Sequence, residues 1–153
     1  MPLKRWGARV LVDLNWQRRM FSLNRQPETI PDYKGVYLIS SRKFLYRYPH
    51  GRSSLAYIGS GSVADRLPAH VYRKEDLIKA LEGEGTMWFW YAQVPQGQYD
   101  CVEQVLFDEF EDRHGAGPAL NKVRPGCEMD WSSFKIRHYN LAFPYDFTRS
   151  DFP

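Results

Sequence analysis

The sequence predicts a single α/β (α+β) domain over residues 1–153, with a small, mainly antiparallel sheet of three or more strands flanked by helices. Three short runs rich in β-branched and aromatic residues, 35–40, 55–59 and 87–94, are typical of strands. Segments with helical spacing of apolar residues follow the second and third runs. A chain of 153 residues can bury one substantial core and is too short for two compact domains.

The N-terminal flank contains one candidate strand, residues 9–14, with the sequence Arg-Val-Leu-Val-Asp-Leu. The next stretch, 16–23, fits neither a helix nor a strand clearly. Pro27 and Pro31 close this flank before the first strand of the core.

The runs 35–40 and 55–59 are each bounded by turn-forming residues, and we expect them to pair as antiparallel strands. Side chains of a strand alternate between the two faces of a sheet. Tyr37 and Tyr57 can therefore present their phenols on one face.

The segment 41–54 interleaves cationic and aromatic side chains and contains no acid. Its four cations are Arg42, Lys43, Arg47 and Arg52. This composition favours a loop that grips phosphates and stacks on bases. The alternative is an extended hairpin whose aromatic side chains cover the sheet, and the two interpretations are compatible.

Residues 62–65, Ser-Val-Ala-Asp, have the spacing of a capping box and predict the start of a helix. That helix would carry Arg66 and His70 four residues apart, on one face. A further helical stretch is predicted over 74–81.

The strand run 87–94 is followed by a predicted helix that begins at Asp100 and ends near residue 114. Val102, Leu106 and Phe110 have the spacing of a face in contact with the core. The C-terminal tail is too aromatic for a disordered extension, and we expect it to pack on the domain.

The net charge of +3 is unevenly distributed. Residues 1–79 contain fifteen Lys and Arg against six Asp and Glu, whereas residues 80–153 contain six against twelve. Clustered positive charge of this kind attracts a phosphodiester polyanion, although scattered solvated side chains would give the same totals.

No run of eighteen apolar residues occurs, and the N-terminus lacks the apolar core of a signal peptide. We therefore expect no membrane partner and a cytoplasmic, intracellular protein. Cys101 and Cys127 are the only cysteines, and we predict that both are reduced thiols.

Five ordered elements carry a family resemblance: Gly35-Val36-Tyr37, Tyr57-Ile58-Gly59, Arg66 with His70, Glu103, and Asn121. In this order they resemble the GIY-YIG nuclease superfamily, over about residues 33–122. The two extensions outside this core are expected to pack on it. The sequence departs from the common pattern in two places, since the stretch between the tyrosine motifs is long and Ser60 stands where many members carry lysine nearby.

The resemblance implies a metal-dependent endonuclease that hydrolyses phosphodiester bonds of DNA. The implied catalytic residues are Tyr37, Tyr57, Arg66, His70, Glu103 and Asn121. Glu103 would hold one Mg²⁺ or Mn²⁺ ion, and a tyrosine phenolate, Tyr37 rather than Tyr57, would help to deprotonate the attacking water. Arg66 and His70 would hold the phosphate, and Asn121 would orient the site.

Each of these residues also has a purely structural interpretation. Both tyrosines can be ordinary residues at the edge of a core, and Arg66 can form a surface ion pair. Glu103, three residues after Asp100, can be the reciprocal half of a capping box. Asn121 can be a turn residue.

Three other functions remain open at this point. The chain can be an RNA-directed nuclease or toxin-like effector, a nucleic-acid-binding module without catalysis, or an interaction protein that uses its aromatic tail. Among nuclease roles, the small size favours a stand-alone bacterial or phage enzyme. Substrate specificity and oligomeric state are not encoded in these motifs.

Overall fold

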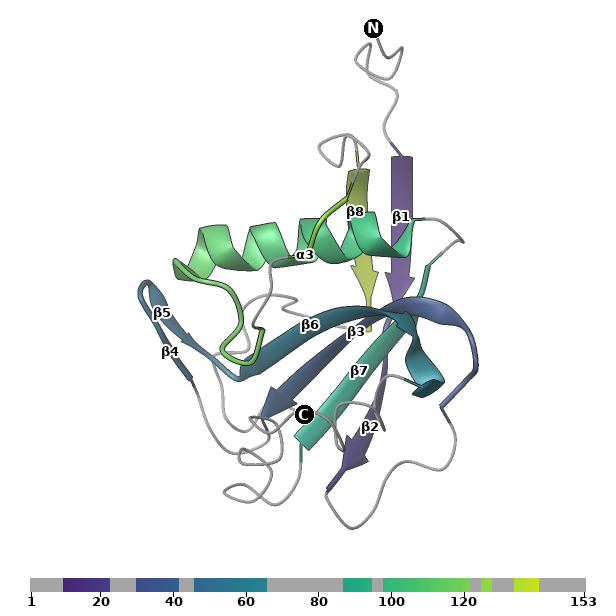
Figure 1. Cartoon of the computed structure of the whole chain (residues 1–153), viewed down its shortest axis with the longest axis horizontal. Helices are drawn as coiled ribbons and strands as arrows, with labels where there is room; N and C mark the ends of the chain where they lie inside the picture. Colours follow the sequence, from purple (N-terminus) through teal and green to yellow (C-terminus); the bar gives the residue numbers. More distant parts are fainter. Residues whose placement is uncertain are drawn as a thin grey trace, which may run out of the picture.

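The computed structural model describes residues 10–22, 30–41, 46–65, 87–94, 98–121, 125–127 and 134–140 (Figure 1). A four-stranded antiparallel sheet forms the centre of this part of the chain. Its strands, in spatial order, are β2 (Gln17–Phe21), β7 (Met87–Gln93), β3 (Lys34–Ser41) and β6 (Leu55–Ser62). The prediction of a mainly antiparallel sheet with helix is confirmed, and the ambiguous stretch after Trp16 is an edge strand.

The helix α3 (Tyr99–His114) lies over one face of this sheet (Figure 1). Val102, Leu106 and Phe110 are buried there, as their spacing predicts. The helix begins one residue before Asp100 and ends at Gly115, whose φ of 83° gives the left-handed cap conformation that glycine adopts without strain. In the described residues, no helix has the length and apolarity needed to span a bilayer.

The opposite face of the sheet carries a second, strongly aromatic cluster. Its largest buried members are Phe21, Tyr37, Ile39, Phe89 and Tyr91. The sheet is therefore buried on both faces. This explains why its central strands lack the alternation of apolar and polar residues that a half-exposed strand shows.

Both extensions meet in a separate two-stranded sheet. β1 (Val10–Asn15) pairs in parallel with β8 (Phe134–Tyr139), so the strand predicted over 9–14 is confirmed. The tail packs back on the domain in the range 134–140, as expected, and Phe134 joins the core beneath α3. The indole N–H of Trp16, which separates β1 from β2, donates to Nδ1 of His138 at 2.9 Å.

A short hairpin, β4 (Tyr46–Tyr48) and β5 (Gly51–Ser53), precedes β6 and lies beside the C-terminal end of α3 (Figure 1). The sequence allowed two interpretations of the segment 41–54, a phosphate-gripping loop and an extended hairpin. The described part of this segment forms the hairpin. Its aromatic residues face the core, since the ring of Tyr48 packs edge-on against Phe110 at 5.0 Å. Its two described cations, Arg47 and Arg52, are exposed.

Candidate functional site

The two motif tyrosines lie on neighbouring strands with their rings stacked. Tyr37 on β3 and Tyr57 on β6 have ring centroids 5.9 Å apart and planes inclined by 18°. Strands β3 and β6 are antiparallel, and both rings belong to the aromatic cluster opposite α3. The predictions of an antiparallel pair and of phenols on one face are confirmed. Tyr37 is fully buried, whereas Tyr57 is partly exposed.

Gly59 faces Tyr37 directly across the strand pair. A Cβ atom built on Gly59 would lie 2.3 Å from both Cζ and Oη of Tyr37. The phenol ring of Tyr37, in the first tripeptide, thus lies directly over Gly59, in the second tripeptide. The last residue of Tyr57-Ile58-Gly59 has to be glycine because of this contact, and the two tripeptides act as one structural unit.

Gly35 in the first tripeptide has a similar constraint. A Cβ atom there would lie 2.0 Å from the carbonyl oxygen of Ala92 on β7. Backbone of the central sheet cannot move aside as a flexible side chain can, so this position also requires glycine.

Glu103 lies in α3 and reaches β6 at Ser60. The Ser60 hydroxyl donates to Oε1 of Glu103 at 2.5 Å. Gln98 is the N-cap of the helix and makes no side-chain capping bond, so Glu103 is the fifth helical residue rather than the third. The capping-box interpretation of Glu103 is therefore wrong, because the helix begins earlier than the sequence suggests.

Asn121 binds the outer edge of β6 through both ends of its side-chain amide. Its Oδ1 accepts from the backbone N–H of Ile58 at 3.0 Å, and its Nδ2 donates to the Ile58 carbonyl at 2.9 Å. The preceding residue, Leu120, donates its N–H to the Ala56 carbonyl at 2.8 Å. Asn121 is more than a turn residue, because it fixes the strand that carries Tyr57 and Ser60.

Three predicted site residues thus converge on one four-residue stretch, residues 57–60 of β6. Tyr57 lies on the aromatic face of the strand, Glu103 approaches from the α3 face, and Asn121 binds the outer edge. The carboxylate and the phenols are on opposite faces of β6, which the motif pattern alone does not reveal.

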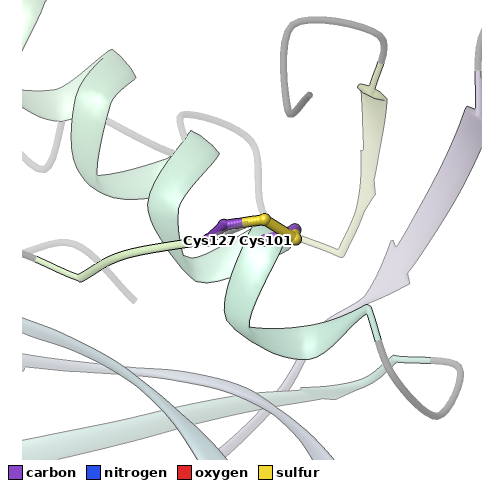
Figure 2. Close-up of a disulfide and its surroundings, with 2 residues drawn as sticks. All are labelled: Cys101 and Cys127. Atoms are coloured by element: carbon purple, nitrogen blue, oxygen red, sulfur yellow. A yellow bond between two sulfur atoms is a disulfide. The ribbon is translucent and has the colours of Figure 1, made fainter. Parts of the chain in front are cut away.

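The structure corrects the prediction for the cysteines. Cys101 and Cys127 form a disulfide, with Cα atoms 4.9 Å apart (Figure 2). The bond joins the first turn of α3 to the segment after Asn121, because that segment returns along the helix once it has paired with β6. Two cysteines separated by 26 residues give no sign of this proximity in the sequence.

Other predicted residues fall partly outside the described ranges. Arg66, His70, Arg42 and Lys43 lie outside them, as does the predicted helical stretch 74–81. Residues 63–65 are helical, as the capping-box spacing predicts. Arg47 and Arg52 are described and lie exposed on β4 and β5.

Sequence reasoning identified Ser60 only as a departure from the common pattern, although it is the hydrogen-bond partner of Glu103. It assigned Tyr48 only to the aromatic side chains of a hairpin that cover the sheet. The Tyr48 hydroxyl donates to the Leu55 carbonyl at 2.7 Å and accepts from the Ala119 N–H at 2.9 Å, which ties the hairpin to the start of β6 and to the segment before Asn121. No local pattern in the sequence indicates either contact.

The donor atoms at residues 57–60 suit a hard cation. Glu103 and Ser60 bring carboxylate and hydroxyl oxygen together at a partly exposed position. Within the described ranges, no three His, Cys, Asp or Glu residues gather as a ligand group. A single carboxylate completed by water and phosphate is how Mg²⁺ is commonly held, so Glu103 fits such an ion.

No protein-family model, curated protein or solved structure matches this chain.

Proposed function

We propose that this protein is a divalent-metal-dependent endonuclease that hydrolyses phosphodiester bonds of DNA, with its site at the outer edge of β6. One observation carries the proposal. Residues 57–60 carry a phenol on one face, contact a carboxylate on the other face and bind a carboxamide at the outer edge, and these groups come from elements far apart in the sequence. They are the residue types that the five-part motif order assigns to such chemistry.

Glu103 would hold Mg²⁺ or Mn²⁺, with its carboxylate oriented by the Ser60 hydroxyl. When bound, the cation supplies positive charge at the scissile phosphate. The acidic side chain thus has one task in this proposal, which is to fix the cation beside the edge of β6.

The tyrosines divide two further tasks according to their burial. Tyr57 is partly exposed, so its phenol is the one that can reach water and assist in its deprotonation. Tyr37 is fully buried between Tyr57 and Phe89, so it positions the Tyr57 ring. This reverses the order of the two tyrosines that the resemblance suggests.

Asn121 holds β6 in register at Ile58, which keeps Tyr57 and Ser60 at fixed positions on either side of the edge. Arg66 and His70, which follow β6 in the sequence, are proposed to bind the phosphate and to stabilise the charge that develops on it.

The test is incubation of the protein with supercoiled plasmid, single-stranded DNA and RNA, with and without Mg²⁺. Nicking of DNA only when Mg²⁺ is present supports the proposal. Cleavage restricted to RNA would favour an RNA-directed nuclease or toxin-like effector, and binding without cleavage would favour a module that lacks catalysis.

Glu103→Gln is the decisive variant, because the amide keeps an oxygen that can accept from Ser60 while it removes the charge. We expect at least about a hundredfold loss of nicking, with melting close to that of the wild type. Glu109→Gln is the matched control, since Glu109 is an exposed carboxylate on the same helix. Equal nicking by the two variants would contradict the assignment of Glu103.

A further inference from the structure

Two arginines lie directly opposite each other on the hairpin β4–β5. Arg47 and Arg52 are register partners in this antiparallel pair, and both side chains are exposed. Residues opposite each other in an antiparallel pair project to the same face of the ribbon. The two guanidinium groups therefore leave the hairpin on one side, away from the ring of Tyr48, which packs on Phe110.

Like charges directly opposite on paired strands destabilise the pairing. Within the described ranges, no ion pair joins a carboxylate to Arg47 or Arg52, whereas Arg137 pairs with Asp13. An anion between the two guanidinium groups would relieve the repulsion. Phosphate matches the planar donors of arginine, which bind its oxygens in two places.

The hairpin is held in a fixed position despite this repulsion. The hydroxyl of Tyr48 bonds to both Leu55 and Ala119, and the backbone N–H of His50 donates to the His114 carbonyl at 3.0 Å. Burial raises the pKa of Tyr48, so its hydroxyl remains a hydrogen-bond donor throughout the physiological pH range. The arginine pair is thereby attached to the last turn of α3.

The same helix carries Glu103 near its other end. From Glu103 to His114 is eleven residues, which at 1.5 Å per residue is about 16 Å. A strand of duplex DNA advances 3.4 Å per nucleotide, so this distance corresponds to about five nucleotides. The helix thus places the point at which the hairpin is attached about 16 Å along its axis from Glu103.

We propose that Arg47 and Arg52 form a second phosphate-binding subsite, which grips the DNA backbone about five nucleotides from the phosphate at β6. The spacing rests on the proposed function, whereas phosphate binding by the pair does not. The subsite adds affinity and fixes where the substrate lies, and it takes no part in the chemistry.

The binding test titrates a labelled duplex in EDTA at several salt concentrations, against wild type and the double variant Arg47→Gln/Arg52→Gln. Loss of one neutralised phosphate removes about 0.9 from the slope of log affinity against log salt, and both arginines grip the same phosphate, so the double variant should lose about 0.9. Lys135→Gln removes an exposed cation of β8 and should leave the slope unchanged. A double variant with the wild-type slope would overturn the proposal, whether or not the protein cuts DNA.

The spacing test maps cut positions on an end-labelled duplex in Mg²⁺. Wild type should cut poorly wherever fewer than about five base pairs remain on the side that the arginines contact. The double variant should lose this end effect while it cuts more slowly at all positions below saturation. An end effect that persists in the double variant would overturn the proposed spacing. If the double variant changed the salt slope of binding but the wild type cut no DNA, the nuclease proposal would be refuted and the subsite supported.

Discussion

Substituting Gly59 by alanine tests whether the phenol of Tyr37 crosses the second tripeptide. The new methyl group would lie 2.3 Å from Cζ and Oη of Tyr37, about 1 Å inside ordinary van der Waals contact. The ring cannot simply rotate away, because it is buried and stacks on Tyr57 at 5.9 Å and on Phe89 at 5.2 Å. The substitution must therefore displace the ring or separate β3 from β6.

Overpacking of this kind typically costs about 1–3 kcal/mol of unfolding free energy. For a domain of this size, each 1 kcal/mol lowers the melting temperature by about 2–4 °C, so Gly59→Ala should melt about 2–12 °C below wild type. Gly126→Ala is the matched control, since a Cβ atom there meets no heavy atom within 4 Å. Its melting temperature should stay close to that of the wild type.

A double-mutant cycle identifies the cause of the loss. In a Tyr37→Leu background the clashing ring atoms are absent, so the added cost of Gly59→Ala should fall by more than half. Thermal and urea denaturation of the four proteins provide the measurement. If Gly59→Ala were as stable as Gly126→Ala, or equally costly with and without the ring, the contact between the tripeptides would be refuted.

Two further predictions concern stability. The disulfide between Cys101 and Cys127 closes a loop of 26 residues. Its reduction, or its removal by Cys127→Ser, should lower the unfolding free energy by about 3.5 kcal/mol, because the unfolded chain gains entropy. If wild type melted at the same temperature with and without reductant, the disulfide would be contradicted. Burial lowers the pKa of His138 from 6.5 to about 4. Between pH 6.5 and pH 4 this histidine is therefore protonated in the unfolded state and neutral in the folded state. The unfolding free energy falls as the pH falls through this range, by up to about 3 kcal/mol. Urea denaturation at pH 7.5, 6 and 5 measures this fall, and His138→Gln, which keeps an acceptor for Trp16, should show less of it; an unchanged pH dependence would refute the assignment.

The central strands were predictable because the sequence marks them locally. Residues 35–40 and 55–59 are short β-rich runs between turn-forming residues, and a buried strand needs little more than that to be identified. Antiparallel pairing predicted that Tyr37 and Tyr57 present their phenols on one face, whereas their stacking depends on the register of the two strands. The sequence also predicted which face of α3 contacts the core, because the apolar residues of the helix recur at the helical period.

Two features that were not predicted depend on contacts between distant segments. The hydrogen bond between Ser60 and Glu103 joins residues 43 positions apart, and the bond between Cys101 and Cys127 requires the chain to turn back along α3. The motif order therefore indicates which residues belong to the candidate site. The faces of β6 on which they lie come only from the tertiary structure.

The parallel pairing of β1 with β8 has a consequence for synthesis of the chain on the ribosome. Val10 pairs with Phe134 and Asn15 with Tyr139, so the first described strand has no β-sheet partner until nearly the whole domain has been translated. At about 5–20 residues per second, β1 waits several seconds or longer for that partner. The central sheet can assemble earlier, whereas Trp16 acquires its bond to His138 only in the last step. Truncation within either extension should therefore affect both strands at once. Premature termination or a ribosome stall before residue 134 would leave β1 as an unpaired edge strand that can aggregate.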